Sequence, residues 1–173
     1  MKRKVVILVL SISLVAAAIF VTGLTRYQNR QTKKSTQANY FPVTELLSLD
    51  HNVYSTRSLA DSAFYKLIVI FDPDCDHCQY EIAQLTRERA RLAAASCLFI
   101  SPKPVEELGR FEKTRIDSGK TAIRMYEIKP DQWLRLFKGN PLPDIYLYGP
   151  NNVLIKNFWG ETPAAVIIQA INQ

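Results

Sequence analysis

The stretch Phe71-Asp72-Pro73-Asp74-Cys75-Asp76-His77-Cys78-Gln79 joins an apolar run to a helical pattern. The run, residues 67–71, is short and rich in β-branched and aromatic side chains, which predicts a buried strand. Two thiols at such a junction can close a small disulfide ring. The first would lie at a helix N-terminus, where free N–H groups and the helix dipole favour a thiolate. The stretch therefore predicts redox chemistry, because a disulfide that closes so short a loop would stabilise the fold very little.

The charge of the chain is unevenly distributed. The 173 residues include 22 Lys and Arg against 16 Asp and Glu, a net charge of +6. Seven of the basic residues precede Ser35 and no acid occurs before Glu45, so the remainder carries a net charge of −1. A basic surface for nucleic acid is therefore not expected on the folded part, and nucleic acid is excluded as a partner.

An uncharged, largely apolar run occupies residues 5–24, behind Lys2-Arg3-Lys4. A helix of that length can cross a hydrocarbon core of about 30 Å, and the basic residues before it are typical of a signal peptide or signal-anchor. We predict a transmembrane signal-anchor at residues 1–25, a polar linker at 26–39 and one domain at 40–173. Cleavage after the small residues 16–18, which would release a secreted domain, stays open as the alternative.

The rest of the sequence alternates between strand and helix patterns. Two strands are expected to flank a turn at residues 50–52, and a closing strand pair is expected before the last helix. The last helix would have Thr162 as its N-cap and Pro163 at its first position. The expected elements are strands 43–49, 53–56, 67–71, 97–100, 122–128, 145–148 and 153–158, and helices 76–95, 105–116, 131–137 and 162–171. This order predicts an α/β fold with a mixed sheet and helices on its faces.

The strand, the Cys-x-x-Cys helix and the later Leu142-Pro143-Asp144-Ile145-Tyr146 resemble the thioredoxin-like fold. More narrowly, residues 40–173 resemble the membrane-anchored TlpA/ResA-like thiol–disulfide oxidoreductases of bacteria. The resemblance implies a three-layer α/β fold with a central mixed sheet between helices, behind an N-terminal transmembrane helix. It also implies a single-pass protein of the bacterial inner membrane whose domain faces the periplasm or the cell exterior.

The resemblance implies catalytic roles for three residues. Cys75 would be the nucleophile, Cys78 would resolve the mixed disulfide, and Glu81 would transfer protons near the thiols. The partners would be protein thiols and disulfides of the exported compartment, together with an upstream electron donor or acceptor. No cofactor is implied beyond the redox-active disulfide of Cys75 and Cys78.

The family also has a cis-proline that faces the disulfide just before a strand. Pro143 matches that position, and Pro141 is the alternative. A cis X-Pro bond places the preceding backbone so that it can pair with an extended substrate, so Leu142 would present its backbone groups to the substrate.

The surroundings of the thiols give opposed expectations. The family usually has tryptophan before the first cysteine and proline before the second, where this chain has Asp74 and His77. A protonated His77 would favour a Cys75 thiolate, whereas the negative charges of Asp72, Asp74, Asp76 and Glu81 would disfavour it. Asp76 is alternatively a favourable acid in the first helical turn. The direction of exchange (reduction, oxidation or isomerisation) therefore stays open.

Two other functions compete with catalysis. The chain is alternatively a tethered binding or chaperone module that uses the groove of the fold without turnover. A metal-delivery protein is a weaker alternative, because Cys75, His77 and Cys78 offer three ligands and structural zinc usually needs four. Cys97 lies in an expected core strand and His51 in an expected turn, so neither is predicted to complete a site.

Overall fold

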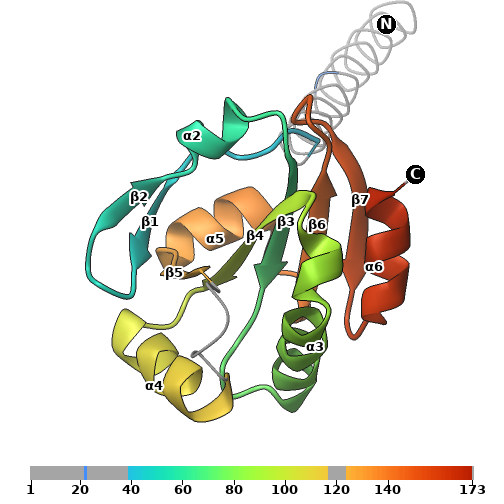
Figure 1. Cartoon of the computed structure of the whole chain (residues 1–173). Helices are drawn as coiled ribbons and strands as arrows, with labels where there is room; N and C mark the ends of the chain where they lie inside the picture. The colour runs from blue at the N-terminus through green and yellow to red at the C-terminus, as the bar shows by residue number, and fades with distance from the viewer. Residues whose placement is uncertain (1–21, 23–38, 117–123, 173) are drawn as a thin grey trace, which may run out of the picture. The chain divides into compact units, whose positions relative to one another are not determined.

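A mixed sheet forms the centre of the domain (Figure 1). The computed structural model describes residue 22 and residues 39–116 and 124–172. Within these ranges, seven strands join in the order β2-β1-β5-β4-β3-β6-β7. The strands are β1 (Glu45–Ser48), β2 (Val53–Ser55), β3 (Tyr65–Ile70), β4 (Ala95–Ser101), β5 (Arg124–Glu127), β6 (Asp144–Tyr148) and β7 (Leu154–Trp159). The predicted mixed sheet is thereby confirmed.

The strand β3 lies inside the sheet with a partner on each side. It pairs in parallel with β4 and antiparallel with β6. Strands β4 and β5 are also parallel, whereas β1–β2 and β6–β7 are antiparallel pairs. Because β3 and β4 run in the same direction, the loops that follow them leave the sheet at one edge. The start of β6 lies at this same edge, since Asp144 pairs with Ile70, the last residue of β3.

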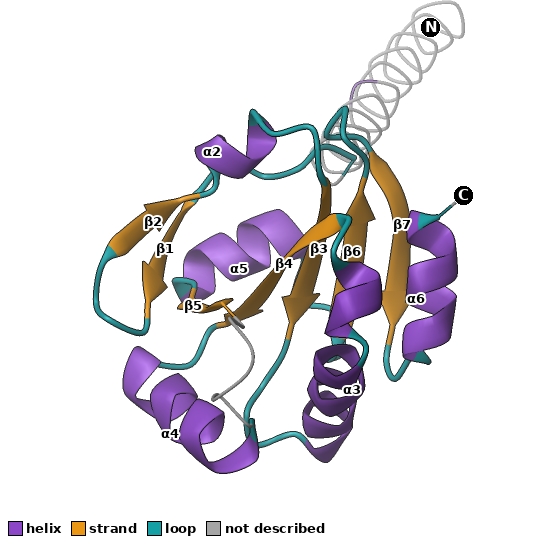
Figure 2. Cartoon of the chain, viewed as in Figure 1, coloured by secondary structure: helices purple, strands orange, loops and turns teal. Residues whose placement is uncertain are grey.

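Helices cover both faces of the sheet (Figure 2). The helices are α2 (Arg57–Ala60), α3 (Asp76–Arg87), the 3₁₀ helix η1 (Arg89–Leu92), α4 (Val105–Arg115), α5 (Pro130–Phe137) and α6 (Ala164–Ile171). Side chains alternate along β3: Leu67 and Val69 pack into a core with α3, α4 and α6, whereas Ile68 and Ile70 pack into a second core with α5. Both cores are apolar, so β3 is buried on both faces.

Several predicted boundaries differ from the observed ones. The helix predicted for residues 76–95 ends at Arg87, and the chain continues as η1, which still buries Leu92. Tightening of a helix end into a 3₁₀ turn is common. The short helix α2 was not predicted, because four residues are too few to show a helical hydrophobic period. The predicted turn at residues 50–52 is confirmed, with an exposed His51 at φ 60°.

The prediction of Thr162 as an N-cap is wrong. Pro163 occupies the cap position, with extended backbone angles, and α6 begins at Ala164. Thr162 makes other bonds: its backbone N–H donates to Glu81, and its hydroxyl donates to the carbonyl of Gly160. The residue therefore connects α6 to α3 rather than capping a helix.

The predicted signal-anchor lies outside the described residues, apart from Thr22, and the linker does too, apart from Asn39. In the part of the chain that the structure describes, no helix is both long and apolar enough to cross a membrane.

Candidate active site

The loop from β3 into α3 carries the two cysteines. Cys75 is the N-cap of α3 and has extended backbone angles, φ −93° and ψ 117°. Asp72 holds the loop in place: its carboxylate accepts the N–H of Asp74 at 2.9 Å, and its carbonyl accepts the N–H of Cys75 at 3.1 Å. The side chain of Gln79 donates back to the carbonyl of Pro73 at 2.8 Å. These bonds fix the first cysteine at the helix N-terminus, as the sequence predicts.

The two cysteines differ in their access to solvent. Cys75 is half-buried, whereas Cys78 is fully buried, and both are free thiols in this structure. Burial is the main reason why the pKa of Cys78 is raised to about 12. A backbone hydrogen bond with Asp72 lowers this pKa, and a hydrogen bond with the adjacent Cys75 thiol raises it. An attacking group can therefore reach Cys75 but not Cys78, and Cys78 needs a base before it can react.

Glu81 lies one helical turn beyond Cys78, on the same face of α3. It is fully buried, and one carboxylate oxygen accepts the backbone N–H of Thr162 at 2.8 Å. The other oxygen, Oε1, has no hydrogen-bond partner among the residues that the structure describes. Burial raises the pKa of Glu81 to about 7, the N–H of Thr162 lowers it, and the charge of Glu161 raises it. Glu81 can therefore gain and lose a proton near neutral pH, next to the buried thiol.

His77 points away from the protein core and pairs with a residue that the sequence did not indicate. Its side chain is 73% exposed, and Nδ1 contacts the Glu161 carboxylate. Glu161 directly precedes Thr162, so one short loop contacts both His77 and Glu81. The imidazole between the thiols is therefore in contact with a carboxylate rather than free. Because 84 residues separate His77 from Glu161, no local pattern predicts the contact.

The acids beside Cys75 are balanced by Lys103, which the sequence reasoning also missed. The Lys103 ammonium lies 3.1 Å from Asp74 and 3.7 Å from Asp72, and these contacts raise the pKa of Lys103. Lys103 follows β4 and Asp72 follows β3, so parallel pairing brings the two loops together. Asp76 is exposed in the first turn of α3. The acids thus oppose a thiolate less than their number suggests.

Leu142 and Pro143 lie at the same edge of the sheet. The bond between them is cis, as predicted for Pro143 rather than Pro141. Pro143 is buried directly before β6, and its carbonyl accepts the N–H of Gly160 at 2.9 Å. Leu142 and Cys75 both pack, half-buried, against the core that contains α3. Leu142 also packs against the second core, so the segment expected to hold substrate and the reactive thiol share an edge of the sheet rather than one face.

The remaining candidates do not join this site. Cys97 is half-buried rather than fully buried as predicted, and burial raises its pKa to about 11. It is in the first half of β4, whereas Cys75 follows the last residue of the adjacent parallel strand. Among the described residues, no group of three or more His, Cys, Asp or Glu side chains is arranged to hold a metal ion.

Comparison with known proteins identifies the fold. No protein-family model matches the sequence, and no curated protein matches it. Solved structures do match. A thiol:disulfide interchange protein of the thioredoxin family from Chlorobium tepidum is 14% identical, with a TM-score of 0.64 over 78% of this chain and 94% of its own. The dsbF protein of Mycobacterium tuberculosis, solved in mixed oxidised and reduced forms, is 14% identical, with a TM-score of 0.62 over 79% of this chain and 95% of its own.

The same fold occurs in a protein of different function. The mitochondrial 2-Cys peroxiredoxin of Plasmodium falciparum is 10% identical, with a TM-score of 0.63 over 79% of this chain and 91% of its own. Likeness at this level establishes architecture, and activity has to be argued from the site. Taken with the sheet order and the helices on both faces, these matches show that the chain has a thioredoxin-like fold.

Proposed function

We propose that the chain is a thiol–disulfide oxidoreductase that uses Cys75 and Cys78. One observation carries the proposal: an accessible thiol at a helix N-terminus adjoins a buried thiol, and a buried carboxyl lies one turn further along the helix. A structural cysteine pair has no need for a buried acid that titrates near neutral pH. Perturbed titratable groups of this kind are typical of active sites.

Reduction of a substrate begins at Cys75. Its thiolate, favoured by the N-terminus of α3, attacks one sulfur of a substrate disulfide. A bond forms between Cys75 and that sulfur, the substrate S–S bond breaks, and the other substrate sulfur leaves as a thiolate. The product is a mixed disulfide, which the substrate backbone can steady by pairing with Leu142 beside Pro143.

Cys78 completes the exchange with Glu81 as its base. The Glu81 carboxylate takes the thiol proton of Cys78, and the resulting thiolate attacks the sulfur of Cys75. The mixed disulfide breaks, the second substrate sulfur leaves and is protonated, and Cys75–Cys78 becomes a disulfide. Two electrons pass to the substrate, so a protein dithiol from an upstream donor must reduce the pair again. Oxidation of a substrate dithiol follows the same steps in reverse.

The direction follows from the charges at the site. Glu161 contacts His77, so the histidine between the thiols lies beside a carboxylate, and on this ground we assign reduction of substrates as the direction. We expect a reduction potential nearer to thioredoxin's, about −270 mV, than to DsbA's, about −120 mV. A measured reduction potential near that of DsbA would mean that the chain oxidises its substrates, and the exchange steps would be the same in reverse.

The place of action rests on the sequence. The apolar run at residues 5–24 supports a membrane anchor, and the exchange of disulfides suits an oxidising compartment. We therefore propose a domain tethered outside the cytoplasm that acts on exported proteins. Fractionation and protease protection of whole cells test the anchor and its orientation separately from the activity.

Single cysteine variants test the chemistry. Cys75→Ser should abolish insulin reduction, whereas Cys78→Ser should still attack and should accumulate a mixed disulfide visible on a non-reducing gel. Cys97→Ser is the matched control and should keep full activity. Retention of full activity by Cys75→Ser would refute the proposal, and slow alkylation of all three thiols without any exchange would favour a binding module instead.

A further inference from the structure

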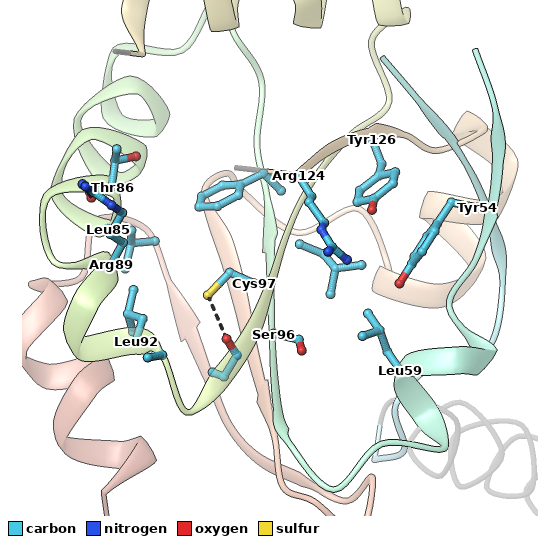
Figure 3. A pocket seen from close by; sticks show the side chains of 14 residues that line it. Tyr54, Leu59, Leu85, Thr86, Arg89, Leu92, Ser96, Cys97, Arg124 and Tyr126 are labelled. Atoms are coloured by element: carbon cyan, nitrogen blue, oxygen red, sulfur yellow. Dashed lines mark hydrogen bonds between the residues drawn. The ribbon is translucent and has the colours of Figure 1, made fainter. Parts of the chain in front are cut away.

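A cavity of about 360 Å³ lies beside the first half of β4 (Figure 3). The active site follows the last residues of β3 and β4, so the cavity and the thiols Cys75 and Cys78 belong to opposite ends of these strands. The proposed function uses none of the cavity residues. Its volume falls within the range of about 300–1,000 Å³ that is usual for small-molecule sites.

Among the described residues, β5 pairs with only part of β4, and the cavity lies beside the rest of that strand. The first β4–β5 pair is Leu98 with Arg124, so within the described residues the segment Ala95–Cys97 pairs with β3 alone. The cavity surrounds this free edge and reaches both cores of the domain. Leu85 and Phe99 contribute from the core that contains α3, and Leu59 contributes from the opposite face. Its walls are therefore apolar on both sides of the sheet.

The charges of the cavity are all of one sign. Arg89 and Arg124 line it, and no Asp or Glu lines it among the described residues. Neither guanidinium forms an ion pair in the described part of the chain; Arg89 makes only a long hydrogen bond, 3.5 Å, to the carbonyl of Thr86. Figure 3 shows the Arg124 side chain between Tyr126 and Cys97, directed into the open space. Arg124 is exposed and bonds to the Tyr126 side chain, so a cation without an ion-pair partner among the described residues lines a cavity with apolar and polar walls.

Two tyrosines form the wall beside Arg124. The rings of Tyr54 and Tyr126 stack with centroids 4.8 Å apart and planes at 26°. The charge of Asp50, in the β1–β2 turn, acts on Tyr126, and Asp50 lines a neighbouring pocket with Arg124 rather than this cavity. Aromatic walls beside the Arg124 guanidinium match a ligand with an apolar body and a planar anionic end, because a guanidinium binds a carboxylate through two parallel hydrogen bonds.

We infer that this cavity binds a small aryl or alkyl carboxylate, whose carboxylate contacts Arg124 and whose apolar part lies against the leucines and the stacked tyrosines. The site is separate from the thiol pair, and the inference stands whether or not the chain exchanges disulfides. Cys97, a half-buried cysteine in the cavity wall, provides a local reporter of occupancy.

Protection of Cys97 from alkylation tests the inference in the full chain. With Cys75→Ser and Cys78→Ser in place, Cys97 is the one thiol left in the sequence. Phenylacetate should slow its reaction with iodoacetamide in a saturable manner, and the neutral phenylacetamide, of nearly the same shape, should not. Arg124→Gln should raise the phenylacetate concentration for half-protection by about tenfold or more, as expected for the loss of a charge-assisted hydrogen bond.

Arg135→Gln is the matched control, because this exposed arginine lies on α5, near Asp131, and does not line the cavity. It should leave protection unchanged. Equal protection by phenylacetamide, an unchanged half-protection value in Arg124→Gln, or no saturable protection would each overturn the inference. None of these results bears on the proposed exchange activity, which is measured with Cys75 and Cys78 intact.

Discussion

The two faces of the sheet each bury an acid near the same edge, and the two acids are held in opposite ways. Asp144 is on the α5 face, where its carboxylate accepts three hydrogen bonds. The donors are the Tyr146 hydroxyl, the Asn140 amide at 3.0 Å and the Asn157 amide at 2.7 Å. Glu81 is on the α3 face with one bond, from Thr162, and one oxygen without a partner. Burial raises the pKa of both acids.

The difference separates a structural acid from a reactive one. Three donors around Asp144 support its charged form and tie together the start of β6, the segment before it and β7. Glu81 lacks such support, so its charged form is costly and its proton can move at neutral pH. Buried polar groups in folded proteins are nearly always satisfied, so an exception next to a buried thiol indicates function.

The pH dependence of stability gives the largest expected difference between the two acids. Glu81 has an ordinary pKa of 4.5 and a folded-state pKa of about 7. Between these values the folded chain holds a proton that the unfolded chain has lost, so stability falls as pH rises from 4.5 to about 7 and this loss is complete above it. The loss amounts to about 3 kcal/mol.

Urea denaturation of the full chain between pH 4.5 and 8 measures this loss. Glu81→Gln should remove it, and because Asp144 is present in both proteins, the difference between the two curves isolates Glu81. Parallel curves for parent and variant would mean that Glu81 is not protonated in the folded protein near neutral pH.

Activity should respond to Glu81 almost as strongly. Without a base for Cys78, resolution of the mixed disulfide at neutral pH should slow by about 100-fold, equivalent to about 2.7 kcal/mol on the barrier. Single-turnover kinetics of Glu81→Gln measures the step directly. Glu88→Gln, at the residue that follows the same helix, is the control and should match the parent; a rate for Glu81→Gln within twofold of the parent would assign the proton transfer to another group.

Substitution of Asp144 should lower the free energy of unfolding and leave the rate of thiol–disulfide exchange nearly unchanged. Asp144→Ala removes one acceptor of the Tyr146 hydroxyl and one of the Asn157 amide, each of which keeps a backbone carbonyl as partner, and this should cost about 2 kcal/mol of unfolding free energy. Asp144→Asn, which keeps an acceptor oxygen, should cost less. The exchange rate per folded molecule should change little in either variant, and a large loss of exchange in both would place Asp144 in the reaction.

The smallest effect should come from substitution of Glu161, whose carboxylate contacts the exposed side chain of His77. Because its charge raises the pKa of Glu81, Glu161→Gln should lower the midpoint of the pH–rate profile by less than about one pH unit. It should also make the thiol pair slightly more oxidising, because His77 loses its partner. Glu106→Gln, an exposed acid on α4, is the control, and equal midpoints in both variants would contradict the role of Glu161.

The sequence predicts the parts of the site that depend on local spacing. Cys75 and Cys78 follow from a strand-to-helix junction, whereas Glu81 and Pro143 are expected only from the resemblance to thioredoxin-like oxidoreductases, whose pattern they match. Lys103 and Glu161 do not follow, since they reach the site only through parallel strand pairing and through a loop far along the chain.

The errors in the fold have similar causes. Thr162 and Pro163 have the residue types of a helix start, but Glu81 takes the Thr162 N–H and the helix begins later. The cavity beside Ala95–Cys97 could not be predicted either, because it depends on where β5 begins to pair with β4.

The position of β3 between β4 and β6 affects how the protein unfolds when it is heated. Its backbone amides are hydrogen-bonded within the sheet and covered on both faces, so they should exchange with deuterated solvent only when the whole domain opens. The reactive thiol follows directly from this most protected strand. Activity and global structure should therefore be lost in a single thermal transition, with no earlier local melting of the loop that carries Cys75.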